Sequence, residues 1–342
     1  MALNRRYSKD LRSINGSGRR LLQGSGPQAS VARAVTASPK RPYMPTMTAI
    51  PAQQLAPFPR PYRIARPALR RLPVVFSSPH SGRSYPPEFL AASALDLGQL
   101  RRSEDGFVDE LFAAAPVLGA PLLHALFPRA YLDANREPYE LDPAMFAESL
   151  PSFVNARSAR VHEGFGTIPR LVTGGLEIYR RKLTFAEAHA RIEALYRPYH
   201  AALATLLAET RARFGEALLI DCHSMPSPEW IPGRPWSGRR PDVVLGDRFG
   251  ASCDPAIVDW AEASLRTRGL GVERNAPFAG GFITAHYGHP RAGIYALQIE
   301  LNRALYMDQV GVVKHDGFAR LKDALTGLMA GLGAALARER AA

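Results

Sequence analysis

The sequence contains little cysteine and no long apolar run. Cys222 and Cys253 are the two cysteines in 342 residues, too few for a disulfide framework, and the lack of a CxxC motif excludes a thiolate zinc knuckle. No stretch of about 18 uninterrupted apolar residues occurs, so no membrane-spanning helix is predicted. We therefore expect a protein of a reducing compartment, the cytoplasm, that contacts no membrane.

Acidic residues are almost missing from the N-terminal stretch. Residues 1–43 hold nine of the 43 Lys and Arg but one of the 31 Asp and Glu, so they carry +8 of the net charge of +12. Because this stretch is rich in Gly, Ser and Arg without apolar periodicity, residues 1–47 are predicted to form a disordered basic tail. A start codon at Met44 or Met47 would exclude the tail, and an organelle transit peptide is the alternative. Residues 48–71 are predicted to be an extended lead-in.

The basic tail leaves open that the protein binds nucleic acid through phosphate contacts. The other 299 residues carry a net charge of only +4, and no aromatic–basic interleaving or helix-turn-helix pattern accompanies the tail. We therefore expect a small-molecule substrate and no nucleic-acid partner. Deletion of residues 1–43 separates the two hypotheses, because a nucleic-acid binder would lose its affinity and an enzyme would keep its turnover.

Short apolar runs alternate with amphipathic stretches from Leu72 onwards. This alternation predicts a single α/β domain over residues 72–342, with a sheet covered by helices on both faces. The apolar runs predict strands over 73–78, 121–125, 130–133, 217–221, 242–246 and 294–301. Apolar residues spaced three or four apart predict helices over 104–115, 184–214, 255–268 and 316–337.

Two histidines follow predicted strands in the same way. His80 comes after an apolar strand in the sequence SSPHSG, and His223 comes after another in DCHSM. Because α/β proteins form their sites where strands end, the two imidazoles can converge as metal ligands. Strand alternation places Asp221 and His223 on one face and Cys222 on the other. This placement disfavours a thiol hydrolase that would use Cys222 with a histidine.

Three carboxylates are candidates for the same site. Glu104 and Asp105 open a predicted helix, where the helix dipole favours negative charge. Either could instead supply the oxygen ligand that completes a catalytic zinc site with two histidines. Glu300 lies in the middle of an apolar strand, where an unpaired carboxylate is costly to bury. It is therefore expected to act as a general base or to form a salt bridge with Arg303 or another arginine.

Two polar loops add candidate substrate contacts. Asn135 and Arg136 follow a predicted strand, and an arginine can bind a carboxylate through two hydrogen bonds, although a surface salt bridge would also use it. His286 and His289 follow a Gly-Gly pair in a loop that is expected to be flexible. Their spacing does not indicate metal ligands, and His286 is taken as a candidate substrate contact.

Eight stretches, in order, resemble the N-formylglutamate amidohydrolase family, enzymes that release formate from N-formylglutamate in histidine degradation. They are SPHSG, SEDGFVDELF, YLDANREP, YRPYHAAL, DCHSM, PDVVLGDRFGASCDP, GGFITAHYGHP and QIELNRALYMD, and they cover about Leu72 to Asp308. The resemblance implies a three-layer α/β/α fold with a mixed central sheet, similar to zinc carboxypeptidases and cell-wall amidases. It also implies one divalent metal ion, usually Zn²⁺. Little matches over residues 142–175, a region that can shape the substrate pocket.

Carried over by position, the resemblance implies metal ligands at His80, Asp105 and His223. It also implies a general base at Glu300 and an anchor for a substrate carboxylate at Arg136. The expected reaction is hydrolysis of N-formyl-L-glutamate, or of a closely related N-acyl amino acid, to formate and glutamate. The alternative is a zinc hydrolase of the same fold that acts on another N-acyl amino acid or on a cell-wall amide.

Overall fold

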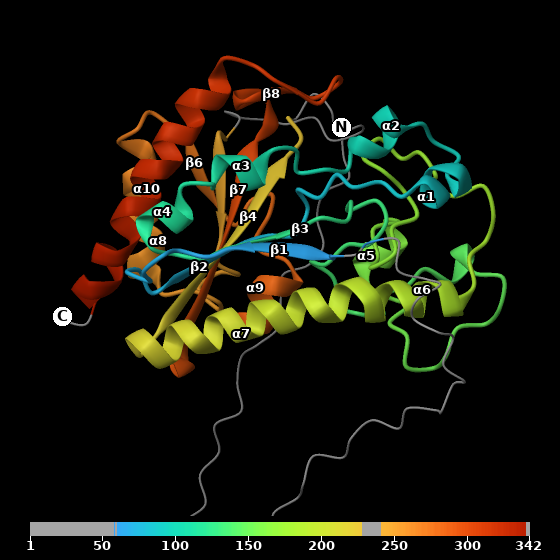
Figure 1. The fold of residues 1–342 in the computed structure, drawn as a ribbon, viewed down its shortest axis with the longest axis horizontal. Helices are drawn as coiled ribbons and strands as arrows, with labels where there is room; N and C mark the ends of the chain where they lie inside the picture. The colour runs from blue at the N-terminus through green and yellow to red at the C-terminus, as the bar shows by residue number, and fades with distance from the viewer. Residues whose placement is uncertain (1–57, 59, 228–240, 340–342) are drawn as a thin grey trace, which may run out of the picture. The chain divides into compact units, whose positions relative to one another are not determined.

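The computed structural model describes residues 58, 60–227 and 241–339 of the chain (Figure 1). The predicted basic tail over 1–47 lies outside these residues and stays a prediction. All described residues belong to one compact unit, Ala49–Ala342. None of the helices in this described part is long and apolar enough to cross a lipid bilayer.

A mixed sheet forms the centre of the described part of the chain, with seven strands in the order β1-β3-β2-β4-β7-β5-β6. Strands β3, β2, β4 and β7 run parallel to one another, whereas β1 is antiparallel to β3 and β5 is antiparallel to β7. The strands are β1 Tyr62–Ala65, β2 Val74–Ser78, β3 Leu122–Ala125, β4 Ala217–Met225, β5 Val243–Gly246, β6 Val272–Arg274 and β7 Ile294–Asn302, with a separate short ribbon of β8 Met307–Asp308 and β9 Val313–Lys314. Strand β1 lies within the stretch 48–71 that was expected to be extended.

Helices cover both faces of the sheet, which confirms the predicted three-layer α/β/α arrangement. Figure 1 shows α7 and α9 on one side of the strands and α8 and α10 on the other. The α-helices are α1 Pro87–Ala92, α2 Leu97–Arg101, α3 Val108–Leu111, α4 Ala115–Leu118, α5 Ala159–His162, α6 Phe185–Arg191, α7 Arg197–Phe214, α8 Pro255–Arg266, α9 Phe282–Tyr287 and α10 Gly317–Glu339. A π-helical turn, η3 Ile192–Tyr196, joins α6 to α7, and 3-10 turns are η2 Pro143–Met145, η5 Pro290–Ala292 and η6 Arg303–Leu305.

Side-chain alternation along the strands divides the apolar core into two layers. Val74 and Phe76 of β2 belong to the cluster that includes residues of α8 and α10, whereas Val75 belongs to the cluster that includes residues of α7. The central strands β2 and β4 are buried at every position. A strand that is covered on both faces is a continuous apolar run in the sequence, which is why the sequence predicted these strands.

Residues 130–133 do not form a strand, so that prediction is wrong. The amides of Tyr131 and Leu132 bond instead to the carbonyl of Pro128 in a turn, and the amide of Asp133 bonds to the carbonyl of Thr167. The four residues are nevertheless buried. Their apolar character therefore reflects burial in an irregular segment rather than strand pairing.

The predicted helix over 104–115 is also wrong. The chain forms two single turns, α3 and α4, and Phe107 ahead of α3 has a left-handed backbone with φ 63°. The amide of Asp105 bonds to the carbonyl of His80 at 3.0 Å, which holds Glu104 and Asp105 in a loop before α3. A tertiary contact thus replaces the helical hydrogen bonds that the local pattern predicted. The other predicted strands and helices are present, and β1, β6, β8 and β9 are additional strands.

Candidate metal centre

Three buried side chains meet at the carboxyl ends of parallel strands. His80 lies in the turn after β2, His223 lies near the end of β4, and Asp105 reaches them from the loop before α3. One nitrogen or oxygen atom of each residue lies within 4.8 Å of the other two. Each of the three residues is at most 2% exposed. The structure therefore brings together the residues that the sequence predicted as metal ligands.

A carboxylate holds the outer nitrogen of each imidazole. His80 Nε2 lies 2.7 Å from Asp133 Oδ1, and His223 Nε2 lies 2.9 Å from Asp221 Oδ2. The Nδ1 atoms of His80 and His223 lie 3.3 Å and 2.9 Å from Asp105 Oδ2. A ring that donates its Nε2–H to a carboxylate keeps the Nδ1 lone pair for a cation. Asp133 and Asp221 thus orient both imidazoles toward the same point.

Asp105, and not Glu104, occupies this centre. Arg303 Nη2 donates to Asp105 Oδ1 at 3.0 Å, so the other oxygen, Oδ2, faces the histidines. Glu104 Oε1 accepts from the Tyr85 hydroxyl at 2.8 Å and from Arg101 Nε at 3.1 Å. The two adjacent carboxylates therefore have different partners, and only Asp105 lies with both imidazoles.

The electrostatics of the centre favours a positive charge among the three candidate ligand atoms. Burial opposes ionisation of Asp105, but hydrogen bonds from His223 and His80 hold the pKa of Asp105 well below its ordinary value. Burial also disfavours a charged His223, yet Asp221 and Asp105 raise the pKa of His223 well above its ordinary value. Two imidazole nitrogens and one carboxylate oxygen are the protein ligands of many catalytic zinc sites. The two Nδ1 atoms and the Asp105 oxygen therefore fit a divalent cation, which would take the place of a proton between them.

Glu300 of β7 lies beside the centre. In the parallel register of β4 and β7 it is the partner of His223, so both side chains face the same side of the sheet. Gln298 Nε2 donates to Glu300 Oε1 at 2.9 Å. Burial raises the pKa of Glu300 to about 7, against the opposing influence of His223. Arg303, the salt-bridge partner considered for Glu300, pairs with Asp105 instead.

Asn135 contacts the outer side of the His223 ring. Its Nδ2 atom lies 3.2 Å from Asp221 Oδ2 and 3.1 Å from His223 Nε2. Its Oδ1 atom accepts from the amide of Ile283, at the start of α9, at 2.7 Å. Asn135, predicted from the sequence as a substrate contact, therefore has its amide engaged by protein groups that border the centre.

Two arginines pair with Asp133 next to the centre. Arg136, the predicted carboxylate anchor, donates from Nε to the carbonyl of Phe165 at 2.7 Å and has Nη2 at 3.4 Å from Asp133 Oδ2. Arg129 donates from Nε to the same Asp133 oxygen at 3.0 Å and has Nη1 at 4.0 Å from Asp105 Oδ1. The Arg129 side chain is 25% exposed and that of Arg136 is 10% exposed. Sequence reasoning missed Arg129, whose only signal was a charge inside an otherwise apolar run.

His286 lies apart from the three candidate ligand atoms. It occupies the exposed side of α9, with its ring stacked on Phe282 at a centroid distance of 4.9 Å. Tyr287 packs edge-on against the same ring at 4.8 Å. The structure therefore does not place His286 among the metal ligands, in agreement with the sequence interpretation, and its contact with substrate stays a prediction.

Cys222 is buried in the layer of α8 and α10, on the opposite face of β4 from His223. Burial raises the pKa of its thiol well above the ordinary value, which disfavours the thiolate that a nucleophile requires. We expect Cys222→Ala to leave turnover nearly unchanged and to lower the free energy of unfolding by about 1 kcal/mol. Turnover and urea unfolding measure the two effects. Lost turnover in a folded Cys222→Ala protein would support the thiol mechanism instead.

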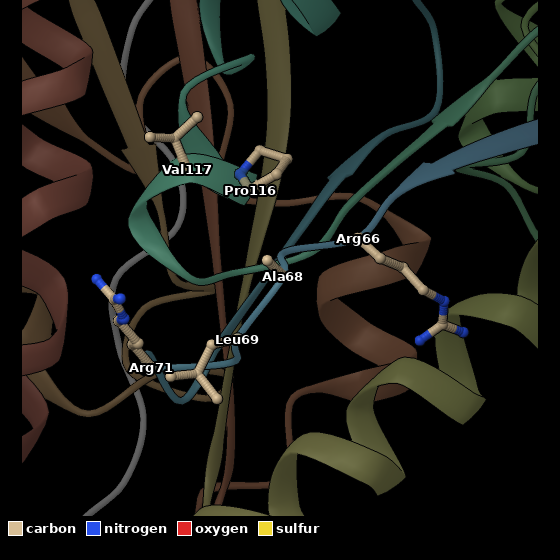
Figure 2. Close-up of a pocket in the computed structure, with 6 residues that line it drawn as sticks. All are labelled: Arg66, Ala68, Leu69, Arg71, Pro116 and Val117. Carbon is tan, nitrogen blue, oxygen red and sulfur yellow. The ribbon is translucent and has the colours of Figure 1, made fainter.

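A separate cavity of about 320 Å³ lies at the other end of the parallel strands. It is lined by Arg66, Ala68, Leu69, Arg71, Pro116 and Val117 (Figure 2). Figure 2 shows the two arginine side chains extending in opposite directions, and Arg66 pairs with Glu209 at 3.2 Å. Residues 66–71 precede β2 and residues 116–117 precede β3, so this cavity contains none of the residues of the metal centre.

A three-layer fold with a buried histidine–carboxylate centre at its strand ends has the ligand set of a metal-dependent hydrolase, and the proteins that the chain is similar to are hydrolases of an amide bond. The model of the family N-formylglutamate amidohydrolase matches residues 72–307. The chain belongs to this family.

Three similar proteins support the assignment. The chain is 34% identical to N-formylglutamate deformylase of Pseudomonas aeruginosa over 242 residues, 70% of this chain and 84% of that protein. It is 30% identical to N-formylglutamate deformylase of Pseudomonas putida over 242 residues, 70% of this chain and 83% of that protein. The crystal structure of N-formylglutamate amidohydrolase from Ralstonia eutropha JMP134 matches with a TM-score of 0.76 and 39% identity, covering 82% of this chain and 99% of that one.

Proposed function

We propose that the protein hydrolyses N-formyl-L-glutamate to formate and glutamate. The observation that carries the proposal is the convergence of His80, Asp105 and His223 at the carboxyl ends of the parallel strands, with Glu300 beside them. Membership of the family and the names of the similar proteins supply the substrate class. The proposal includes a cytoplasmic location and a role in histidine degradation.

The three residues His80, Asp105 and His223 would hold one divalent cation, which we propose to be Zn²⁺. Both imidazoles offer Nδ1 because Asp133 and Asp221 occupy their Nε2 atoms. A divalent cation in this position supplies a Lewis acid toward an amide carbonyl and toward water. Arg303 holds the second oxygen of Asp105 and so keeps its Oδ2 atom directed at the imidazoles.

Glu300 is the proposed general base. It faces the same side of the sheet as His223, and Gln298 fixes one of its oxygens. A carboxylate with a pKa near neutrality can take a proton from the attacking water and return it to the leaving amine of glutamate. The hydrogen bond that Gln298 makes to Oε1 limits rotation of the Glu300 carboxylate.

The substrate carries two carboxylates, and two arginines border the proposed site. Arg136 was predicted as an anchor, and the partly exposed Arg129 adds a second guanidinium group near Asp105. Guanidinium groups suit carboxylates because they donate two parallel hydrogen bonds. We propose that Arg129 and Arg136 together select a dianionic N-acyl amino acid and position its acyl carbon near the centre.

Formate release from a panel of N-acyl amino acids tests the proposed function. N-formyl-L-glutamate should have the highest kcat/KM, above N-acetyl-L-glutamate, which has a larger acyl group, and above N-formyl-L-leucine, which lacks the side-chain carboxylate. Release of acetate but no formate would support a different N-acyl amino acid as substrate. Cleavage of a cell-wall amide with no turnover of the panel would support the other alternative.

Removal of an arginine that binds the side-chain carboxylate should weaken binding of the dianionic N-formyl-L-glutamate more than binding of the monoanionic N-formyl-L-leucine. We expect Arg129→Met to raise KM for N-formyl-L-glutamate by about 10- to 100-fold, the value of a charge-assisted hydrogen bond of about 1.5–3 kcal/mol. The change in KM for N-formyl-L-leucine should be clearly smaller. Arg136→Met serves as the matched comparison. An equal loss on both substrates would exclude the side-chain carboxylate as the partner of that arginine and would assign it to the shared α-carboxylate or to support of Asp133.

A further inference from the structure

The long helix contains a single irregular turn, next to two side chains that contact the segment beside the metal centre. Helices α6 and α7 are continuous through the π-helical turn η3, in which the amide of Arg197 bonds to the carbonyl of Ile192. Pro198 follows directly, and a proline has no amide hydrogen and displaces the carbonyl four residues earlier. A π turn of this kind shifts the helix face by one residue and is frequent at functional sites.

Tyr196, the last residue of the π turn, and His200, four residues further along the helix, lie side by side with ring centroids 4.2 Å apart. The Tyr196 hydroxyl donates to the carbonyl of Arg136 at 2.8 Å. His200 Nε2 lies 2.8 Å from the carbonyl of Ala134, so this nitrogen carries the hydrogen and donates. Burial lowers the pKa of His200 to about 4, and the ring is therefore neutral near pH 7.

The carbonyls of Ala134 and Arg136 belong to the segment 133–136, whose side chains contact the residues of the metal centre. Asp133 contacts His80, and Asn135 contacts His223 and Asp221. The segment 133–136 is neither helix nor strand, so its carbonyls have no ladder of regular hydrogen bonds to fix them. Along the segment, the carbonyls that accept from His200 and Tyr196, at positions 134 and 136, alternate with the side chains of Asp133 and Asn135.

We propose that Tyr196 and His200 are positioning residues that fix the carbonyls of Arg136 and Ala134. They thereby aim Asp133 at His80, and Asn135 at Asp221, the carboxylate that holds His223. The inference rests on the proposed function for its catalytic consequence. Its structural part, the orientation of His80 and His223, does not depend on which substrate is turned over. Groups that orient metal ligands are typically worth about 10- to 100-fold in metal affinity or activity.

Tyr196→Phe and His200→Leu test the proposal. Tyr196→Phe keeps the ring and removes one hydrogen bond, whereas His200→Leu keeps a similar volume and removes the bond to the Ala134 carbonyl together with the bond between Nδ1 and the Tyr287 hydroxyl. Both should weaken Zn²⁺ affinity, measured by competition with a chelator, by about 10-fold or more, and should lower kcat for formate release with a smaller change in KM. His200→Gln should recover part of both losses, since its Nε2 donor can replace that of histidine. The imidazole ¹⁵N chemical shifts of His80 and His223 should also move in both variants.

Thr210→Val provides the matched control on the same helix. It removes a buried hydroxyl that donates to the carbonyl of Leu206 at 2.7 Å, far along α7 from the π turn. It should lower the melting temperature. Its Zn²⁺ affinity, its kcat and the ¹⁵N shifts of His80 and His223 should equal those of the parent protein. If Tyr196→Phe and His200→Leu behave as Thr210→Val does, the positioning role is refuted. If the parent protein releases no formate but the ¹⁵N shifts move as expected, the proposed function fails and the positioning role stands.

Discussion

We expect His80→Ala and His223→Ala each to yield a folded protein that has lost the proposed metal ion and formate release together. Each substitution removes one of three converging ligand atoms, and the remaining pair binds a divalent cation weakly. Even groups that only orient a ligand cost about 10- to 100-fold, so loss of the ligand itself should lower activity by more than about 100-fold. Elemental analysis of purified protein should give about one metal ion per chain for the parent and far less for the variants.

The control for this prediction is His124→Ala. His124 lies on the neighbouring strand β3, with Nδ1 at 3.8 Å from Asp109, and contributes no atom to the centre. It should retain both metal and turnover. An active parent protein without metal, or a His80→Ala protein that keeps its metal, would contradict the assignment of the ligands.

The adjacent carboxylates offer a second comparison within one loop. Asp105→Asn should lose metal and activity, because its Oδ2 atom faces both imidazoles. Glu104→Gln should keep both, since its partners are Tyr85 and Arg101. Loss of metal from Glu104→Gln with retention in Asp105→Asn would reverse the assignment of the acidic ligand.

Glu300→Gln is expected to lose the reaction and keep the proposed metal ion. Glutamine has the same shape, and its carbonyl oxygen can still accept the hydrogen bond that Gln298 now donates to Glu300, but it cannot take a proton from water. The kcat for formate release should therefore fall by about two to four orders of magnitude, the usual contribution of a positioned acid–base group. Metal content and substrate affinity should change little, because the three ligand atoms and both arginines are untouched.

The pattern of losses identifies the role of Glu300. A ligand variant loses metal, an arginine variant raises KM, and a base variant lowers kcat alone. Glu104→Gln, also a buried glutamate, should match the parent protein in all three quantities. Near-normal turnover in Glu300→Gln would remove Glu300 from the mechanism, and Asp221 or His286 would then be tested as the base in the same way.

The residues that sequence alone located are those governed by short-range periodicity. His80 and His223 each follow a run of apolar residues in a strand that is buried on both faces of the sheet. The runs 74–76 and 217–220 are visible in the sequence because each of their positions is apolar. Alternation along β4 also separated His223 from Cys222, since successive side chains of a strand point to opposite faces. The sequence alone therefore determined the α/β class, the strand-end histidines and the inert position of the thiol.

Only the tertiary structure decided how the loops between these strands meet. The local pattern favoured a helix at Glu104 and Asp105, but the bond between the Asp105 amide and the His80 carbonyl, which joins residues distant in the sequence, holds them in a loop. The segment 130–133 has the composition of a strand and is a buried turn. Arg129 and Arg303 gave no sequence signal for their places beside Asp105, because their roles depend on contacts with residues far along the chain. Local propensities are worth a few tenths of a kcal/mol per residue, and these long-range hydrogen bonds and buried contacts outweigh them.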